Sequence, residues 1–394
     1  MNFKIVWFIP VFLISAFFVA VVIPAIIRTA NKMNLYDSQD ERKVHKGNVP
    51  RLGGISFFPA IVFSILMVIS AMSIYSPVEI MFKYGSITQV MMALAGCVIL
   101  FLIGIIDDVI GVSYKYKFIA QILASMLICA SGLWIKNLHG MFGIHQLHAA
   151  VGIPITLFVI VLIINAINLI DGVDGLASGL CILGTLGYSA VFFYKDMNIY
   201  LLLSAAILGV LIVFYSYNVL GKPGTTKIFM GDTGSLTMGY LVAVFAIKLT
   251  TLDKAGTLNP NDGLYFIYAA SLILIPVMDV FRVFFARIRN GKGPFYPDKR
   301  HIHHKFMALG LSMRQTRFLI FLISILFFAM NLLMYRYLQL NINMLVLIDA
   351  VVWIIMNLII SRRVKYLRSI NDPVALRYSH IGDTFKLRRR KRRN

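Results

Sequence analysis

Long apolar stretches separated by short polar segments run through most of the sequence. Each stretch approaches 20 residues, about the length that a helix needs to cross the hydrocarbon core of a bilayer. Apolar and polar residues do not alternate at every second position, so the pattern does not favour a membrane β-barrel. We therefore predict about eleven membrane-spanning helices. They are residues 5–27, 54–75, 90–106, 117–135, 151–170, 175–194, 200–218, 233–250, 263–285, 318–337 and 342–360.

The composition excludes an ordinary water-soluble domain. Of 394 residues, 59% are hydrophobic and 14% are charged, whereas about a quarter of the residues in soluble domains are charged. The three cysteines lie inside apolar runs without a CxxC pair, so no disulfide framework or thiolate metal site is indicated. The first apolar run is too long for a signal-peptide core and is interpreted as a retained span. We expect an all-α integral membrane protein whose site is built from helix ends and short loops.

Basic residues are concentrated on one side of the predicted membrane. The chain has 38 Lys+Arg against 17 Asp+Glu, a formal net charge of +21. One set of alternate loops, with the C-terminal tail, carries 30 Lys and Arg, while the other set carries seven. The positive-inside rule then places the N-terminus outside and the C-terminus in the cytoplasm. We divide the chain into a polytopic catalytic domain, residues 1–360, and a basic cytoplasmic tail, residues 361–394.

The tail contains the low-complexity stretch KLRRRKRR at residues 386–393. Basic residues close to an anionic leaflet each contribute about 1 kcal/mol of attraction, so we expect this stretch to contact anionic membrane lipid. A solvated topology signal is the second interpretation, and RNA binding is the least favoured. We therefore expect no nucleic-acid partner.

Six aspartates fall at the predicted cytoplasmic helix ends. The orientation was derived from Lys and Arg alone, so the positions of the aspartates did not influence it. They are Asp107, Asp108, Asp171, Asp174, Asp232 and Asp279. The motif FLIGIIDD ends the third span with two adjacent carboxylates, which repel each other unless a cation lies between them. The pair indicates a metal or phosphate-handling site, with two solvated helix-ending acids as the alternative. Lys115 and Lys117 follow, either to hold phosphate or to mark the membrane border.

The motif NAINLIDGVDGLASG repeats polar residues at intervals of three on an apolar background: Asn165, Asn168, Asp171 and Asp174. Residues three apart share a helix face, so these side chains converge if the helix continues or bends. An unpaired carboxylate at mid-bilayer costs about 2.5 to 3.5 kcal/mol, so it needs a partner or water. The glycines of DGVDG permit a break and a close approach by a ligand. The pattern favours a binding site over simple helix packing.

The motif KIFMGDTGSLTMGY places Asp232 directly before a span. One interpretation is a simple helix cap. The other is an acid that holds Mg²⁺ together with phosphate oxygens, which a helix N-terminus attracts. Both interpretations stay open on this motif alone. The upstream segment GKPGTTK lacks the spacing of a Walker loop, which excludes a P-loop NTPase.

The motif DKRHIHHK lies in the longest predicted cytoplasmic loop and contains His301, His303 and His304. Three histidines can ligate zinc, but the neighbouring Arg300 and Lys305 oppose a divalent cation, and no HExxH helix is present. A phosphate or diphosphate site suits these charges better. Zinc binding and an inert basic loop are the alternatives.

Carboxylates that suit a divalent cation and basic groups that suit phosphate are thus predicted on one membrane face. This layout is expected for metal-assisted phosphoryl transfer, in which positioning and charge neutralisation do most of the catalysis. The many spans favour a lipid substrate. The leading alternative from another class is a polytopic transporter, but only Asp349 lies mid-span among the predicted helices. A catalytically inactive scaffold is the third possibility.

In this order, FLIGIIDD, NLIDGVDGLASG, FMGDTGS and DKRHIHH closely resemble the motifs of the polyprenyl-phosphate N-acetylhexosamine-1-phosphate transferase family. The resemblance extends from PRLGG at 50–54 to Arg317. It implies transfer of N-acetylglucosamine-1-phosphate from UDP-N-acetylglucosamine to undecaprenyl phosphate, with release of UMP and with Mg²⁺ or Mn²⁺ as cofactor. The cell-wall muramoyl-pentapeptide branch of the family has HHH where this sequence has HIHH. In this respect the sequence is similar to the enzymes that begin O-antigen, common-antigen or teichoic-acid synthesis. Another UDP-N-acetylhexosamine donor stays open.

The resemblance also implies roles for individual residues. Asp232 and Asn168 would hold the metal, and Asp107 would be the debated base for the lipid phosphate. The residues implied to orient metal, phosphate and nucleotide are Asp108, Asp171 and Asp174. Those implied at the nucleotide subsite are Lys117 and Asn218. Those implied at the sugar-phosphate region of the donor are Arg300, His301, His303 and His304.

Two basic residues near PRLGG, Lys46 and Arg51, are expected either to contact phosphate or to be topology residues. The resemblance also implies a location in the bacterial cytoplasmic (inner) membrane, with the active site facing the cytoplasm. A homodimer is left open.

Overall fold

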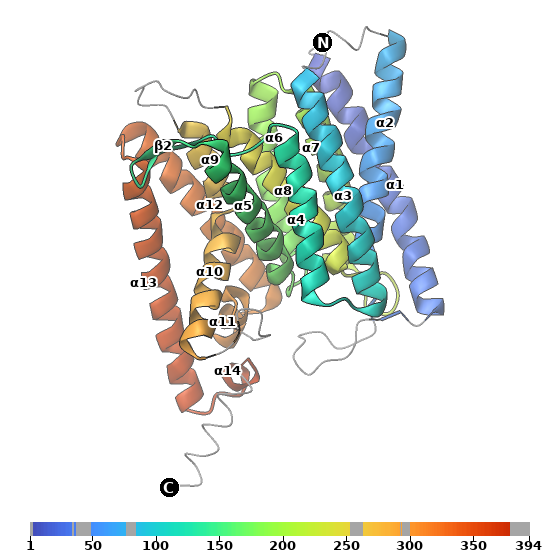
Figure 1. Ribbon diagram of the computed structural model, residues 1–394. Coiled ribbons are helices and arrows are strands. Elements are labelled where there is room, and N and C mark those ends of the chain that lie inside the picture. Colours follow the sequence, from blue (N-terminus) through green and yellow to red (C-terminus); the bar gives the residue numbers. More distant parts are fainter. Residues whose placement is uncertain are drawn as a thin grey trace. The chain divides into compact units, whose positions relative to one another are not determined.

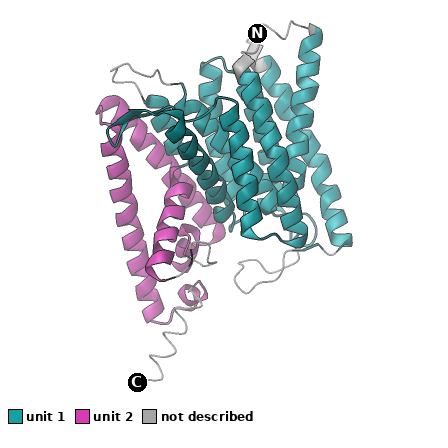
Figure 2. Ribbon diagram, in the orientation of Figure 1, with its two compact units in different colours: residues 1–273 teal, residues 274–394 magenta. Residues whose placement is uncertain are grey.

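The computed structural model describes residues 3–33, 35–36, 49–75, 84–252, 263–291, 293 and 300–378. Lys46 and the stretch KLRRRKRR lie outside these residues. The described chain is helical apart from its loops and one β-hairpin (Figure 1). It forms two compact units, Met1–Ile273 and Leu274–Asn394 (Figure 2). The predicted boundary after residue 360 is not tested, and the last long helix continues through it to Ser369.

The first unit contains nine α-helices within the described residues, and a short 3₁₀ helix precedes the second of them. Their bounds are α1 Phe3–Lys32, η1 Gly53–Ser56, α2 Phe57–Tyr75, α3 Tyr84–Ile110, α4 Tyr114–Ala130, α5 Ala149–Ile170, α6 Leu176–Tyr194, α7 Asn198–Leu220, α8 Gly231–Thr250 and α9 Leu264–Leu272. An antiparallel hairpin of β1 (Asn137–Met141) and β2 (Ile144–Gln146) joins α4 to α5.

Helix α8 is the core of this unit, and α3, α5, α6 and α9 pack around it (Figure 1). Nearly every α8 side chain is buried, including the polar ones at its start. Small residues allow neighbouring backbones to come this close. A Cβ on Gly104 of α3 would lie 2.5 Å from the Cα of Thr233, and one on Gly54 would overlap the backbone of Gly234. Close packing therefore brings the end of α3 and the segment before α2 against the start of α8.

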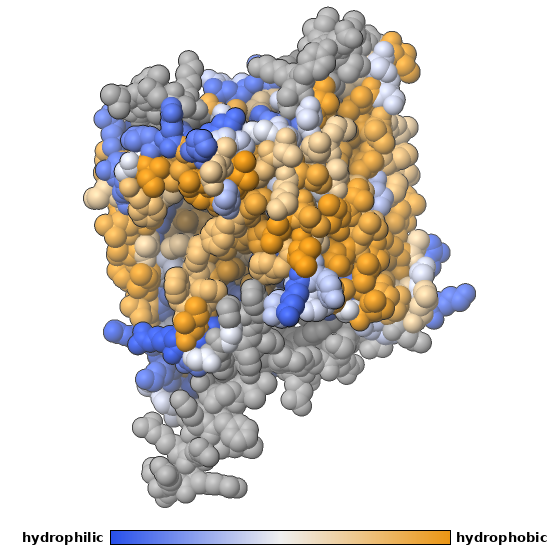
Figure 3. All heavy atoms as spheres, in the orientation of Figure 1, coloured by the Kyte–Doolittle hydropathy of each residue, from blue (hydrophilic) through white to orange (hydrophobic). Residues whose placement is uncertain are grey.

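Apolar side chains cover the outer faces of these helices. Figure 3 shows them as a broad band along the sides of the first unit, with hydrophilic residues gathered near the helix ends. Exposed members on α3 and α4 include Val98, Leu102, Ile106, Ile119, Leu123 and Met126. Contiguous apolar surface of this extent is unusual on a soluble monomer and is expected where a protein faces lipid.

The second unit begins with α10 (Leu274–Arg289) and contains the short helix α11 (Ile302–Ala308). Two long helices follow, α12 (Met313–Tyr337) and α13 (Ile342–Ser369), and then the short α14 (Pro373–Arg377). The mid-span acid Asp349 on α13 is buried and accepts a hydrogen bond from Nδ2 of Asn331 on α12 at 2.9 Å. This hydrogen bond engages one oxygen of the acid, while its Oδ1 has no hydrogen-bond partner within the described residues.

The eleven predicted apolar runs coincide largely with helices, although residues 54–56 belong to η1, residues 131–135 follow the end of α4, and residues 263–285 are divided between α9 and α10. Nine helices of the described chain are long and apolar enough to cross a membrane, or ten if α9 and α10 make one span. Helix α4, on the fourth predicted span, has 17 residues, short of the roughly 20 that a span usually needs. The prediction of an all-α integral membrane protein is confirmed, while the count of eleven and the orientation stay predictions.

Candidate active site

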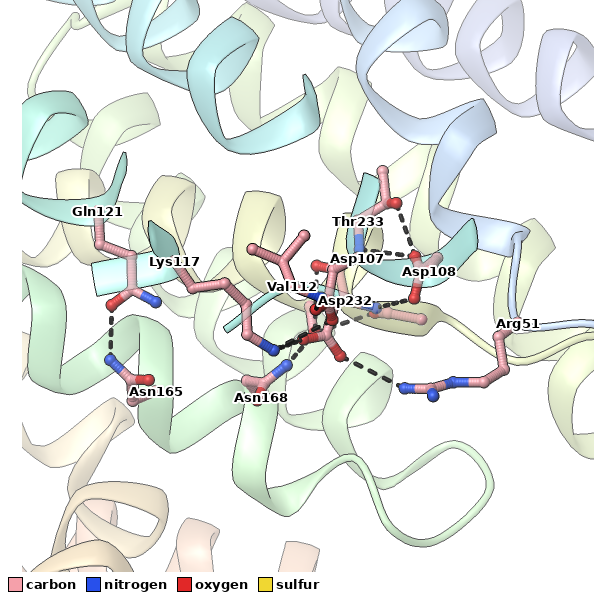
Figure 4. Close-up of polar contacts among 12 residues, drawn as sticks. Arg51, Asp107, Asp108, Val112, Lys117, Gln121, Asn165, Asn168, Asp232 and Thr233 are labelled. Carbon is pink, nitrogen blue, oxygen red and sulfur yellow. Dashed lines mark hydrogen bonds and ion pairs between the residues drawn. The ribbon is translucent and has the colours of Figure 1, made fainter. Parts of the chain in front are cut away.

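Three carboxylates from two helices meet at the start of α8. Asp107 and Asp108 lie near the C-terminal end of α3, and Asp232 lies in the first turn of α8 (Figure 4). Each offers one oxygen within 4.8 Å of the others, and within the described residues this is the only such group of His, Cys, Asp or Glu. The structure thus brings together the FLIGIIDD and FMGDTGS motifs, more than 100 residues apart, as a group that could hold a metal ion.

Asp108 joins the two helices. Its Oδ1 accepts the backbone N–H of Asp232 at 2.8 Å, and its Oδ2 accepts the backbone N–H of Thr233 at 2.9 Å and the Thr233 hydroxyl at 2.6 Å. These N–H groups belong to the first turn of α8 and have no acceptor within the helix. Asp108 therefore caps α8 from a neighbouring helix and fixes the position of Asp232.

Gly231 makes this cap possible. Its φ of +70° is in the left-handed region, and a Cβ there would lie 2.5 Å from Oδ2 of Asp108 and would overlap the carbonyl oxygen of Arg51. Only glycine adopts this conformation with so little space available. The glycine that precedes Asp232 is thus required for a close contact between three segments.

Two basic side chains neutralise the carboxylates. Nζ of Lys117 lies 3.0 Å from Oδ2 of Asp107 and 2.7 Å from Oδ2 of Asp232 (Figure 4). Nη2 of Arg51 lies 3.4 Å from Oδ1 of Asp232. A positive charge between two carboxylates removes their mutual repulsion. Lys117 supplies that charge within the protein. Arg51, which the sequence predicted either to contact phosphate or to be a topology residue, lies in the site.

Asn168 reaches the same place from α5. Its Nδ2 donates to Oγ of Ser235 in the first turns of α8 at 2.8 Å. Asn165, one turn earlier, instead bonds to Oε1 of Gln121 on α4 at 2.6 Å and lies apart from the carboxylates (Figure 4). The three-residue spacing therefore brings Asn168 to the site and leaves Asn165 in a contact between helices.

The DGVDG turn packs next to this site through Asp174 and Asn218, which the sequence predicted, and through Lys227, which it did not single out. Asp174 forms a buried ion pair with Lys227, five residues before Asp232. Asn218, predicted at the nucleotide subsite, accepts the N–H of Gly175 at 2.6 Å and donates to the carbonyl of Ile228 at 2.8 Å. Both contacts tie the turn between α5 and α6 to the segment that leads into α8. The position of Lys227 in the KIFMGD motif was the available signal for its role.

Asp171 lies in the turn itself, outside the membrane-spanning helices. Burial raises its pKa well above the usual range, and the negative charges of Asp232, Asp174 and Asp108 act in the same direction, while the Arg51 charge opposes them. A carboxylate in such surroundings gains from any cation that binds nearby. Asp171 thus experiences the electrostatic field of the carboxylate site.

The histidine motif is organised by Asp279 of α10. Its Oδ2 lies 2.9 Å from Nδ1 of His301, while Oδ1 accepts the N–H of Ile302 at 3.1 Å and a hydrogen bond from Nη2 of Arg282 at 2.6 Å. Arg282 Nη2 also donates to the carbonyl of Arg300 at 2.5 Å. The sequence pattern indicated Asp279 only as one of six helix-end acids. Its function as the partner of His301 depends on how close α10 lies to the start of α11.

His303 stacks on His301, and His304 lies tilted against His303. The His301 and His303 rings are parallel with centroids 5.7 Å apart, and the His303 and His304 centroids are 4.2 Å apart. His303 is 1% exposed, and within the described chain neither of its ring nitrogens has a hydrogen-bond partner. Burial, followed by the charges of neighbouring histidines and Arg282, holds the His303 pKa well below its usual range. His303 is thus a neutral imidazole with a donor and an acceptor both available.

The long apolar helices, with polar groups gathered at their ends, define a multi-pass membrane protein. The sequence matches the model of glycosyl transferase family 4 over residues 90–250. It is 32% identical to the probable undecaprenyl-phosphate N-acetylglucosaminyl 1-phosphate transferase of Bacillus subtilis, over 87% of this chain and 86% of that protein. The chain therefore belongs to glycosyl transferase family 4, as its four motifs predicted.

Two further relatives are both named undecaprenyl-phosphate alpha-N-acetylglucosaminyl 1-phosphate transferase. The protein of Yersinia pestis is 32% identical over 74% of this chain and 75% of its own length. The protein of Escherichia coli K12 is 29% identical over 78% of each chain. The match to the family model includes α3, α5 and the start of α8, the elements that form the carboxylate site.

Proposed function

We propose that the protein transfers N-acetylglucosamine-1-phosphate from UDP-N-acetylglucosamine to undecaprenyl phosphate, with release of UMP. The product is a lipid-linked diphosphate sugar that would begin O-antigen, common-antigen or teichoic-acid synthesis. The observation that carries the proposal is the group of Asp107, Asp108 and Asp232, placed at helix ends in a family whose relatives are named for this reaction.

The donor set suits Mg²⁺ or Mn²⁺. Hard divalent cations prefer oxygen ligands and are usually held by one or two carboxylates together with substrate phosphates. Asp107 and Asp232 supply carboxylate oxygens within one group, and the amide oxygen of Asn168 lies on a side chain already bonded at the start of α8. These three residues would hold the ion, and Asp108 would keep Asp232 in place. When bound, the ion would supply neutralisation of charge on the diphosphate.

The reaction is a direct displacement. An oxygen of undecaprenyl phosphate forms a bond to the β-phosphorus of the donor, and the bond from that phosphorus to the oxygen bridging to UMP breaks. One diphosphate linkage replaces another, so the reaction is nearly balanced and reversible. The second pKa of a phosphate monoester is about 6, so the attacking oxygen is already ionised at neutral pH. Asp107, paired with Lys117, is then needed for charge and position more than for proton removal.

The histidines of α11, with Arg300, would bind the sugar-phosphate region of the donor. Asp279 holds Nδ1 of His301, which leaves Nε2 of that ring as its ligand-facing atom. His303 contributes a neutral imidazole whose nitrogens have no protein partner in the described chain. Both rings can therefore hydrogen-bond to a sugar or phosphate oxygen.

The excess of Lys and Arg on one side supports a bacterial cytoplasmic membrane location with the site facing the cytoplasm, where the donor would be available. The basic tail would contact anionic lipid of the same leaflet. A second UDP-N-acetylhexosamine as donor is the alternative within the same chemistry.

The test uses purified protein in detergent with Mg²⁺, undecaprenyl phosphate and a panel of UDP-sugars, and identifies the lipid product by mass. We expect a product heavier than the lipid by N-acetylhexosamine phosphate from UDP-N-acetylglucosamine, together with UMP. Asp232→Asn should yield none, while Asp196→Asn, at an exposed acid on another loop, should match the wild type. Solute uptake into liposomes without UMP formation would instead support a transporter.

A further inference from the structure

Lys305, the last residue of the DKRHIHHK motif, bonds to the last long helix of the unit. Its Nζ donates to Oδ1 of Asn357 at 3.1 Å and to Oγ of Ser361 at 2.8 Å, both on α13. The three histidines and Lys305 are consecutive within α11 and its N-cap, apart from Ile302. This lysine is thus a direct link from the helix that carries the histidines to α13.

The two residues of α13 that accept from Lys305, Asn357 and Ser361, form a small polar pair on an otherwise apolar surface, called the acceptor pair below. Asn357 and Ser361 are four residues apart and share one helix face. Asn357 is 6% exposed, and its Nδ2 donates to the carbonyl of Trp353 at 3.0 Å, so Lys305 is the partner that satisfies its Oδ1. Ser361 in turn donates to the carbonyl of Asn357 at 2.6 Å. A buried amide without a partner is costly in an apolar environment. The acceptor pair therefore needs the lysine as its donor.

Helix α11 needs an external anchor. It has seven residues, about two turns, and isolated helices of that length are unstable in water. The His303 ring makes no hydrogen bond within the described chain, so the backbone of α11 and the adjacent rings set its direction. Any rotation of α11 would therefore turn His303 away from its present position.

The segment after α13 supports the same helix. Arg368 of α13 donates to the carbonyl of Tyr378 at 3.1 Å, which holds the end of α14 in place. The Tyr378 ring then lies 6.3 Å from the His304 ring, between centroids. Helix α11 is thus held by α13 directly, through Lys305, and indirectly through α14.

We propose that Lys305 is a positioning residue for donor binding: its link to Asn357 and Ser361 fixes α11 on α13 and so orients the three histidines. The inference rests on the proposed function of those histidines and adds that α13 takes part in donor recognition through this link. It differs from direct phosphate binding by Lys305, in which the ammonium would leave α13 to reach the donor.

The first experiment compares three variants. They are Lys305→Met, a double variant of the acceptor pair (Asn357→Leu with Ser361→Ala), and the triple variant that combines all three substitutions. UMP release would be followed at varied concentrations of each substrate. We expect Lys305→Met and the double variant each to raise KM for UDP-N-acetylglucosamine by about tenfold, less than the roughly 100-fold that a misplacement of about 1 Å can cost. KM for undecaprenyl phosphate should change less than twofold. The triple variant should lose no more than either parent, as expected for residues that act through one contact.

Two controls distinguish positioning by Lys305 from direct contact between Lys305 and the donor. Lys365→Met removes an exposed lysine from α13 and should leave KM unchanged, and Lys305→Arg should restore most of the donor affinity. If the double variant keeps wild-type KM while Lys305→Met loses affinity, Lys305 contacts the donor directly and the proposal is wrong. A loss confined to kcat or to thermal stability would also contradict it.

A second measurement does not depend on the proposed reaction. Amide hydrogen exchange over residues 302–308 should be faster in Lys305→Met and in the double variant of the acceptor pair than in wild type and Lys365→Met. Unchanged exchange would refute the link itself, even if the enzyme is active. Faster exchange with no transfer from any UDP-sugar would instead retain the link and reject the proposed function.

Discussion

At the scale of single residues, acids with similar surroundings in the sequence have different functions in the structure. Asp108 has both oxygens engaged by the start of α8, whereas Asp107 and Asp232 share the ammonium of Lys117. Asp174 is paired with Lys227. Adjacent or regularly spaced carboxylates thus divide into those that stabilise the site and those available to a cation.

Asp107 and Asp232 should respond differently to substitution. We expect Asp232→Ala to abolish transfer, because it removes the carboxylate that faces both Lys117 and Arg51. Asp107→Asn should retain measurable activity, because an already ionised lipid phosphate needs no base. Initial rates of UMP release measured from about pH 6, near the second pKa of the lipid phosphate, up to about pH 9 would check this. Full activity of the Asp232 variant would refute its assignment as a metal ligand.

Lys305 should make donor binding depend on pH. Burial and the charges of Arg282 and Arg300 lower its pKa to about 7, although Asp279 opposes them. The charged form is therefore lost as the pH rises through about 7, and a neutral amine is the weaker donor to Asn357 and Ser361. We expect KM for the donor to increase above that pH in wild type. Measurements on Lys305→Arg, which stays charged, should show a flatter profile, and identical profiles would contradict the assignment.

The same pKa has a consequence for folding. Above about pH 7 the folded chain releases this proton, whereas an unfolded lysine keeps it up to its ordinary pKa of 10.5. The unfolded state then binds more protons, so the contribution of Lys305 to stability rises with pH across this interval. Donor affinity and this part of the stability should therefore change in opposite directions.

At the scale of elements, the start of α8 shows how close packing builds the site. Residues of α3, of the segment before α2 and of α5 all contact its first turns. Such proximity requires residues without side chains at the contact points. The glycines near Asp232 consequently influence activity through backbone position, although glycine itself carries no functional group.

Two glycines with the same conformation allow this effect to be isolated. Gly231 and Gly224 have φ values of +70° and +77°, but a Cβ would collide with Asp108 only at Gly231, and at Gly224 it would meet nothing within 4 Å. Gly224→Ala should cost only about 1 kcal/mol of strain. We expect Gly231→Ala to lower UMP release at least about 100-fold, because it displaces Asp232. Equal activity of the two variants would show that strain alone matters.

At the scale of the whole molecule, the chain behaves as a membrane protein whose charges favour one orientation. The apolar sides of its helices suit lipid (Figure 3), and the basic residues of alternate loops suit a cytoplasmic face. The three cysteines, Cys97, Cys129 and Cys181, are buried, so a single introduced cysteine can report on each side.

Introduced cysteines should therefore establish the orientation. Thr225, between α7 and α8, and Gln146, at the end of β2, are exposed in segments predicted to be cytoplasmic and external, respectively. We expect Gln146→Cys to react with a membrane-impermeant maleimide in intact spheroplasts, and Thr225→Cys to react only after permeabilisation. The unsubstituted protein is the control for background labelling. The reverse pattern would contradict the orientation that the Lys and Arg distribution predicts.

Much of this architecture could be predicted from the sequence because hydrocarbon imposes simple requirements. A span needs an apolar run of about 20 residues, and charged groups are costly inside it, so helices and their polar ends are visible in the pattern. All eleven predicted runs are largely helical, and Asp107, Asp108 and Asp232 do lie together. The less predictable part was which polar residues meet, as Asn165 illustrates by bonding to Gln121.

The sequence by itself determined the membrane class, the helical runs and the family, because each follows from local length, polarity and motif order. Only the tertiary structure decided the pairings: Lys117 with two distant acids, Asp174 with Lys227, Asp279 with His301, and Lys305 with α13. A pairing depends on how each helix is rotated and how closely its backbone approaches its neighbours. Helical periodicity identifies the residues that share a face, but side-chain packing selects the partner that the face meets.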